Sequence, residues 1–200
     1  RGVAITNDVV NINQIITDYL ISPEHNRLKS LYTNVQVEIN LATYLLNIIG
    51  SSIHLSKTVM NLVANAAESM PDGGIVSIKT ENRYIDRPVR GYDDVEEGDY
   101  AVLSISDSGI GIAPDDLSRI FEPFYTKKVM GKSGSGLGMA VVWGAVKDHK
   151  GYIDAQSTVG KGSMFTLYFP ATRKEIAREQ LQLAVENYMG KEKSILIVDD

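Results

Sequence analysis

The chain has 200 residues, a formal net charge of −5 and no cysteine. The absence of cysteine excludes disulfides and thiolate zinc sites, and the negative charge gives no electrostatic reason to expect nucleic-acid binding. With 44% apolar and 22% charged residues, the composition is that of a globular domain with enough apolar residues for a full core. No apolar run approaches the roughly 20 residues of a membrane-spanning helix, and no signal peptide is visible.

The first quarter of the chain predicts a helix, a loop and a strand. Apolar residues at helical spacing predict a helix over residues 9–20. His25 follows in a polar stretch, and its two interpretations are a solvated loop histidine and a phosphoacceptor. We favour the loop histidine because the stretch has no amphipathic helical pattern. Strict alternation over 34–41 predicts a half-buried strand, and a short apolar piece covers 44–49.

A helix of about residues 53–70 carries the first candidate site, with Ser51 or Ser52 as its cap. At 100° per residue, four polar residues fall within about 60° of one another, away from the apolar face: His54, Asn61, Asn65 and Glu68. Asparagine is a poor helix former where Lys or Glu would serve better, so two asparagines four residues apart suggest a role. Their amide oxygens could hold Mg²⁺ and orient phosphates, and an ordinary polar outer face is the alternative.

The middle of the chain predicts two strands that deliver a carboxylate to a sheet end. Residues 75–86 alternate as a strand, residues 100–106 form the next strand, and a charged hairpin loop over 87–99 joins them. Asp107 follows the second strand directly. Its carboxylate could accept a hydrogen bond from an exocyclic amine such as adenine N6. The alternative is an Asx turn before Gly109.

Two glycine clusters, 107–112 and 134–139, flank an aromatic and basic segment over 121–128. Each cluster lies at a junction between regular elements, where glycine permits φ > 0 or a close approach of a ligand. Pro114 predicts a short helix through Phe121, and a longer helix should follow the second cluster. The backbone N–H groups at the start of that helix would face an anion. Two such clusters with lysines between them indicate a nucleotide phosphate site.

The C-terminal part predicts a hairpin, a helix and a final strand. Residues 151–157 and 162–169 read as two strands, and His149 before them reads as a helix C-terminal cap. A charged helix is predicted over 173–189. The last residues, SILIVDD, read as a buried strand that ends in two aspartates.

The assembled pattern resembles the ATP-binding catalytic domain of sensor histidine kinases, within the family of gyrase, heat-shock protein 90, histidine kinase and MutL ATPases. The resemblance covers about residues 8–170. Its four motifs occur in order: NLVANAAESM, DSGIGI, FEPFYTKK and GKSGSGLGM. The resemblance implies an α+β fold, a two-layer sandwich with a mixed five-stranded sheet, about three helices, and an ATP lid between the glycine boxes.

The resemblance also implies roles for individual residues. Asn65 would bind Mg²⁺, and Asn61 would contact the phosphates. Asp107 would accept a hydrogen bond from adenine N6, and Lys127 or Lys128 would contact the phosphates. Asn61, Asn65 and Lys127 form the implied catalytic set. The other residues implied to line the ATP site are Glu68, Gly109, Gly111, Ile112, Phe121, Phe124, Thr126, Gly134, Ser135, Gly136, Leu137 and Gly138.

The position of Asn61 favours a histidine kinase, because gyrase-type ATPases and anti-sigma serine kinases carry glutamate there. None of His25, His54 and His149 fits the acceptor pattern of that family. The resemblance therefore implies an ATP-dependent histidine kinase whose acceptor lies on dimerisation helices outside this chain. A non-catalytic nucleotide-binding or docking module and an anti-sigma-type serine kinase are the alternatives.

The resemblance divides the chain into three parts. Residues 1–170 would be the catalytic domain and 171–193 a helical linker. Residues 194–200 resemble the first strand of a response-regulator receiver domain, which implies a hybrid kinase. Because the chain does not begin with methionine, we expect a monomeric fragment of a homodimeric, cytoplasmic or membrane-anchored parent. The expected partners are the dimerisation helices, the receiver domain and a response regulator, with no nucleic acid.

Overall fold

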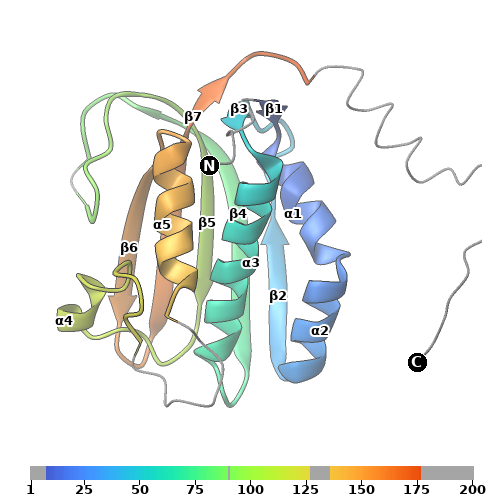
Figure 1. The fold of residues 1–200 in the computed structure, drawn as a ribbon, viewed down its shortest axis with the longest axis vertical. Coiled ribbons are helices and arrows are strands. Elements are labelled where there is room, and N and C mark those ends of the chain that lie inside the picture. The colour runs from blue at the N-terminus through green and yellow to red at the C-terminus, as the bar shows by residue number, and fades with distance from the viewer. Residues whose placement is uncertain (1–7, 90, 127–135, 177–200) are drawn as a thin grey trace, which may run out of the picture.

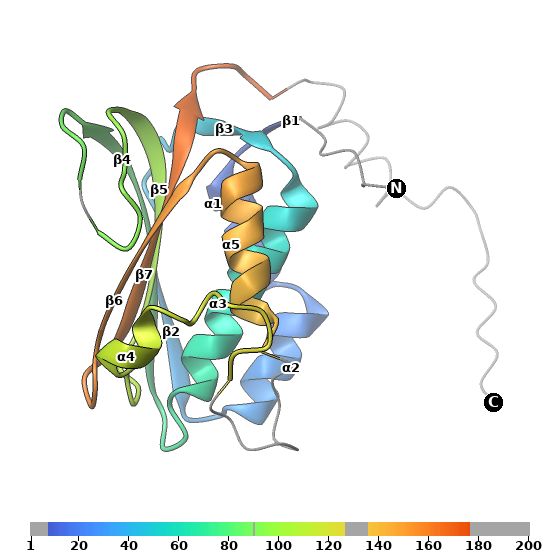
Figure 2. The same cartoon turned by 60° about the vertical axis from the view of Figure 1, so that its left-hand side comes forward.

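The computed structural model describes residues 8–89, 91–126 and 136–176. A mixed seven-stranded sheet forms one layer, and helices α1, α2, α3 and α5 cover one face of it (Figures 1 and 2). This is the predicted two-layer α+β sandwich. Among the described helices, none has the length and apolar character needed to cross a membrane.

The bounds of the elements follow in chain order within each class. The strands are β1 (Asp8–Val10), β2 (Val35–Asn40), β3 (Asn47–Gly50), β4 (Gly74–Ile85), β5 (Gly98–Asp107), β6 (Tyr152–Thr158) and β7 (Gly162–Thr172). The helices are α1 (Ile12–Leu20), α2 (Pro23–Leu31), α3 (Ser52–Glu68), α4 (Pro114–Leu117) and α5 (Gly138–Asp148).

The strands follow the order β1-β3-β7-β5-β4-β2, and β6 also pairs with β7. Among the described strands only β2 and β4 pair in parallel, because a crossover through α3 separates them. The antiparallel β4–β5 register sets Val76 opposite Asp107. The end of β5 therefore lies beside the start of β4, close to where α3 ends.

The five predicted strands are β2, β4, β5, β6 and β7, and the short strands β1 and β3 extend the sheet to seven. The predicted helix over 9–20 begins too early, because Asp8–Val10 pairs with β3. Asn11 is extended and its side chain accepts from the Asn13 N–H, so it caps a helix that starts at Ile12. Helix α4 ends at Leu117 rather than Phe121.

The C-terminal predictions fall mostly beyond the described residues. Residues 173–176 of the predicted helix over 173–189 have no regular structure. The remainder of that helix and the predicted strand over 194–200 lie outside the described residues.

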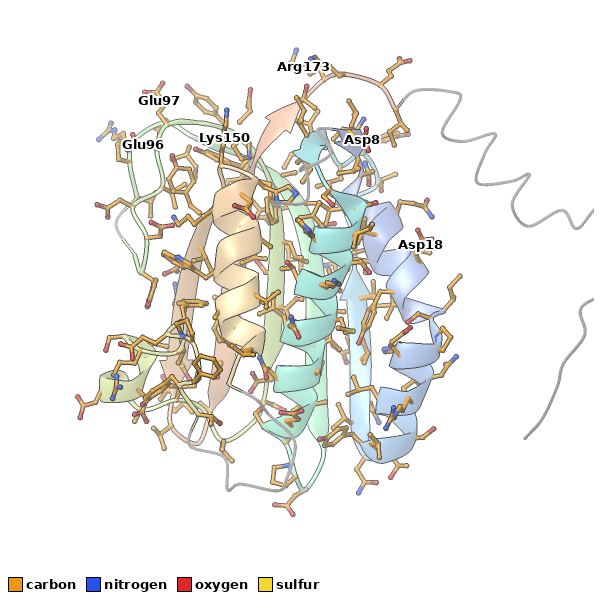
Figure 3. All side chains as sticks on the ribbon, in the orientation of Figure 1. Asp8, Asp18, Glu96, Glu97, Lys150 and Arg173 are labelled. Carbon is orange, nitrogen blue, oxygen red and sulfur yellow. The ribbon has the colours of Figure 1, made fainter. Side chains whose placement is uncertain are left out.

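The main core lies between the sheet and the helices, while charged side chains such as Asp18 point away from it (Figure 3). Helix α3 is central, and its Leu62 and Val63 are fully buried. A second, smaller cluster lies on the opposite face of the sheet, under the loop between β4 and β5. Its members are Ile85, Val95, Tyr100, Val102 and Tyr168.

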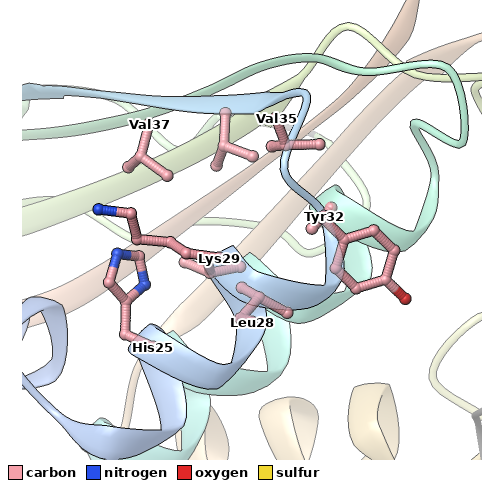
Figure 4. Close-up of a pocket in the computed structure, with 9 residues that line it drawn as sticks. His25, Leu28, Lys29, Tyr32, Val35 and Val37 are labelled. Atoms are coloured by element: carbon pink, nitrogen blue, oxygen red, sulfur yellow. The ribbon is translucent and has the colours of Figure 1, made fainter.

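The interpretation of His25 as a solvated loop residue is wrong. Ser22 caps α2 by accepting from the His25 N–H at 3.2 Å, with Pro23 in the first turn. The His25 ring is 4% exposed and meets the Tyr19 ring edge-on, with centroids 5.1 Å apart. It lines a small pocket between α2 and β2, next to Lys29 (Figure 4). The Ser-Pro pair was the sequence signal for this helix.

Burial, and then the positive charge of Lys29, lower the pKa of His25 from its ordinary 6.5. The unfolded chain therefore binds more protons than the native one below about pH 6.5, so stability should fall as the pH falls through this range. We expect His25→Phe to lose less stability than the wild type between pH 7.5 and 5.5, measured by urea unfolding. An unchanged slope in His25→Phe would contradict the assignment.

Candidate functional site

Helix α3 presents its two asparagines to the start of α5. Both side chains are half-buried. A Cβ atom built on Gly138 would lie 3.5 Å from Asn61 Oδ1 and 3.8 Å from Asn65 Nδ2. The first residue of α5 therefore sits directly against the two amides. Because the N–H groups of a first helical turn have no partner within their helix, this junction combines amide groups with anion-attracting backbone.

His54 does not join this arrangement. It lies in the first turns of α3, where its ring meets the His149 ring edge-on at a centroid distance of 6.5 Å. Glu68 is half-buried in the last turn of the helix.

Asp107 is held by one of its two carboxylate oxygens. Oδ1 accepts from Ser69 Oγ at 3.0 Å, from the Gly109 N–H at 2.9 Å and from the Ser163 N–H at 3.3 Å. Among the described residues, no donor to Oδ2 is recorded. The Gly109 bond is the Asx turn that the sequence allowed. The turn and a second role are compatible, because the turn occupies only one oxygen and leaves the other as an acceptor.

The first glycine cluster is fixed between the end of α3 and the β6–β7 hairpin. A Cβ on Gly109 would come within 2.1 Å of Ser69 Oγ. Gly111 has φ +70°, and a Cβ there would come within 2.2 Å of the Thr158 carbonyl oxygen. The Ile112 N–H donates to Ser157 Oγ at 2.7 Å. Glycine is thus required here by close packing as well as by backbone conformation.

Three residues that position Asp107 were missed by the sequence reasoning. Ser69 and Ser163 donate to its carboxylate, and Gly162 lets the hairpin approach its backbone. Gly162 has φ +100°, and a Cβ there would lie 1.9 Å from the Asp107 carbonyl oxygen. In the sequence, Gly162 reads only as a hairpin residue, because the neighbouring strand is distant along the chain.

The described residues that precede and follow positions 127–135 lie side by side. The Phe124 N–H donates to the Gly136 carbonyl oxygen at 3.0 Å. Both residues have positive φ, 66° and 68°. Phe124 is 73% exposed, whereas Phe121 is buried. Thr126 and Leu137 are exposed next to these ends. The remaining predicted residues, Lys127, Lys128, Gly134 and Ser135, lie outside the described residues.

His149 connects the two helices that form the site. It is 6% exposed, and its Nε2 accepts from the Ser51 N–H at 2.9 Å. Its Nδ1 lies 2.6 Å from the Ala145 carbonyl oxygen, which requires the proton on Nδ1. The predicted capping role is therefore accompanied by a bond to the N-terminus of α3. Gly50 makes room for the ring, since a Cβ there would lie 2.0 Å from His149 Cδ2.

We expect His149→Phe to lower the free energy of unfolding by about 1–3 kcal/mol, the cost of a buried group left without its partner. Phenylalanine keeps a ring in the site but leaves the buried Ser51 N–H without an acceptor. His149→Gln, which offers an amide oxygen, should recover part of the loss. Urea unfolding measures the difference. Equal stability of His149→Phe and wild type would refute the role of His149 in connecting α3 and α5.

Comparison with known proteins identifies the family. Residues 50–173 match the family described as histidine kinase-, DNA gyrase B-, and HSP90-like ATPase. The sensor kinase CckA of Brucella abortus is 35% identical over an alignment of 152 residues that covers 72% of this chain and 16% of CckA. The sensor histidine kinase ZraS of Salmonella typhimurium is 31% identical over 176 residues, 88% of this chain and 33% of ZraS. Both relatives are much longer than the matched region.

Solved structures agree with this match. A mycobacterial sensor histidine kinase, MprB, has a TM-score of 0.63 at 25% identity and covers 82% of this chain and 97% of its own. The nucleotide-free catalytic domain of histidine kinase ThkA has a TM-score of 0.65 at 22% identity, covering 85% of this chain and 97% of its own, and it shows the shared fold. This chain belongs to the histidine kinase-, DNA gyrase B-, and HSP90-like ATPase family.

Proposed function

We propose that this chain is the ATP-binding catalytic module of a sensor histidine kinase and passes the γ-phosphoryl group of ATP to a histidine on a separate helical domain. The observation that carries the proposal is the placement of Asn61 and Asn65 against Gly138, at the start of α5. Phosphoryl transfer requires mainly positioning and charge neutralisation, and amide groups beside a helix N-terminus supply both.

The adenine end of the site would be formed by Asp107. Three donors orient its carboxylate through Oδ1, which leaves Oδ2 to accept from adenine N6. Gly109, Gly111 and Ile112 would form the adjacent wall, because their backbone is pinned between α3 and the β6–β7 hairpin.

The phosphate end would be formed by Asn61, Asn65 and the first turn of α5, with Lys127 or Lys128 approaching the triphosphate. No group of three or more His, Cys, Asp or Glu suited to a metal occurs in the described part of the chain. Mg²⁺ fits the site nonetheless, because it is commonly held by one or two protein oxygens together with substrate phosphates. Asn65 would supply that oxygen, and the bound ion would neutralise phosphate charge.

The phosphoacceptor would come from outside this chain. His25 and His149 are buried, and both ring nitrogens of His149 are hydrogen-bonded. The relatives CckA and ZraS are sensor kinases, and this chain matches only part of each. Residues 194–200 resemble the first strand of a receiver domain, so the residues that follow β7 would link the module to that domain. A response regulator would receive the phosphoryl group.

The test is transfer of labelled γ-phosphate from ATP to a separately supplied histidine-hairpin domain. We expect an acid-labile product that forms only with ATP and Mg²⁺. Binding of ATP with no transfer at high acceptor concentration would favour the non-catalytic docking module. An acid-stable phosphoserine on a partner would instead favour the serine kinase.

A further inference from the structure

The loop between β4 and β5, described over residues 86–89 and 91–97, is fixed at its base. Val89 and Val95 form an isolated antiparallel bridge, with N–O distances of 3.0 and 2.9 Å. Val95 is buried in the smaller core cluster. Figure 1 shows the loop leaving the ends of β4 and β5 and running down beside β6, while Glu96 and Glu97 point outward from it (Figure 3). The loop therefore has an anchored inner side and a charged outer side.

The tip of this loop is bonded to β6 and α5. The Tyr92 N–H donates to Asp154 Oδ1 at 3.1 Å. Asp93 forms an ion pair with Lys147 of α5 and also accepts from the Ile153 N–H at 3.4 Å. These contacts join residues more than fifty positions apart, and they place the Tyr92 side chain over the helical layer.

The Tyr92 ring completes an aromatic cluster with Phe121 and Trp143. Its centroid lies 4.8 Å from that of Phe121 and 5.9 Å from that of Trp143, both edge-on. Phe121 and Trp143 meet at 5.2 Å. The Tyr92 hydroxyl donates to the Ser118 carbonyl oxygen at 3.1 Å. Tyr92 is thus in contact with both the segment after α4 and the middle of α5.

This position bears on the proposed nucleotide site because Phe121 and Trp143 lie close in the chain to residues assigned to that site. Phe121 lies three residues before Phe124, which is hydrogen-bonded to Gly136. Trp143 lies on the helix whose first residue, Gly138, faces Asn61 and Asn65. A contact that holds Phe121 against Trp143 therefore also holds Phe124 and its partner Gly136 in place relative to α5.

We propose that Tyr92 is a positioning residue for nucleotide binding, and that the loop 86–97 is a strap holding Phe121 against α5. The proposal rests on the proposed function, because it assigns the strap to the phosphate end of the same site. Removing the ring should loosen the phosphate end and leave the adenine end at Asp107 unchanged.

The experiment compares Tyr92→Ala, Tyr92→Phe and the control Tyr44→Ala, an exposed tyrosine between β2 and β3. We expect Tyr92→Ala to bind a non-hydrolysable ATP analogue with Mg²⁺ about 10-fold more weakly, as expected for the loss of two aromatic contacts. Affinity for adenosine, which lacks phosphates, should be unchanged. Tyr92→Phe should restore binding to within about threefold, because it keeps the ring contacts.

A second readout needs no nucleotide. Trp143 is the single tryptophan of the chain, so its fluorescence reports on the cluster directly. Tyr92→Ala should increase acrylamide quenching of Trp143, whereas Tyr44→Ala should not. If Tyr92→Ala shows greater quenching but even the wild type binds no nucleotide, the proposed function and the positioning role are both rejected. The packing of Tyr92 against Trp143 is then still supported.

Two results would overturn the positioning role. One is unchanged affinity of a folded Tyr92→Ala for the ATP analogue, and the other is equal weakening for the analogue and adenosine, which indicates a general loss of stability. Should Tyr92→Ala not fold, Asp93→Asn replaces it, because that change removes the charge of the ion pair with Lys147 and leaves the ring in place. Wild-type affinity in Asp93→Asn with unchanged Trp143 quenching would then reject the strap.

Discussion

Asp107→Asn is expected to weaken binding of a non-hydrolysable ATP analogue by about 100-fold or more, since a hydrogen bond to a charged group is lost and a donor remains unpaired. The change is close to isosteric. The amide oxygen can still accept from Ser69, Gly109 and Ser163, while the amide nitrogen takes the place of Oδ2. A donor would then face the N6 donor of adenine, so the loss should be specific to the base.

Calorimetric titration of the wild type and Asp107→Asn measures this effect, and thermal unfolding verifies that the fold is retained. Asp72→Asn, in the exposed turn before β4, is the matched control and should bind like the wild type. Equal affinities of wild type and Asp107→Asn would contradict the contact between Asp107 and adenine. Absence of binding in the wild type would favour the non-catalytic docking module over the kinase.

The second large effect is expected at the phosphate end. Asn65→Ala should abolish the increase in affinity that Mg²⁺ produces and should lower phosphoryl transfer by about 10²–10³-fold, the usual cost of removing one preorganised electrostatic contact. Affinity for ATP without Mg²⁺ should change little, because Asp107 and the start of α5 are untouched. The physical reason is that Asn65 is the residue expected to offer an oxygen to the ion.

Titrations with and without Mg²⁺, together with the transfer assay, separate these contributions. Asn26→Ala serves as the control, because Asn26 is an exposed helical asparagine on α2. A Mg²⁺ effect that survives in Asn65→Ala would transfer the metal role to another residue. Asn61 is then the next to test, since it flanks the same glycine.

Much of this molecule follows from local chemistry. Short runs between turn residues marked the five longer strands, and two of these runs alternated. Apolar spacing with a serine cap marked α3, because period and capping depend only on neighbouring residues. The family resemblance likewise rested on short motifs. Asp107 was identified because a strand delivers it to a sheet end. The sequence alone thus determined the fold class, the family and the main candidate residues.

Only the tertiary structure decided which distant residues support them. Ser69 at the C-terminal end of α3 and Gly162 and Ser163 at the start of β7 converge on Asp107, and nothing in their local sequence marks that function. Burial of His25 depends on how α2 packs against β2 and α3. Tyr92 looks like an ordinary loop residue until the hairpin brings it to Phe121. Local patterns specify which element a residue belongs to, but contacts between elements arise only when the sheet and helices pack together.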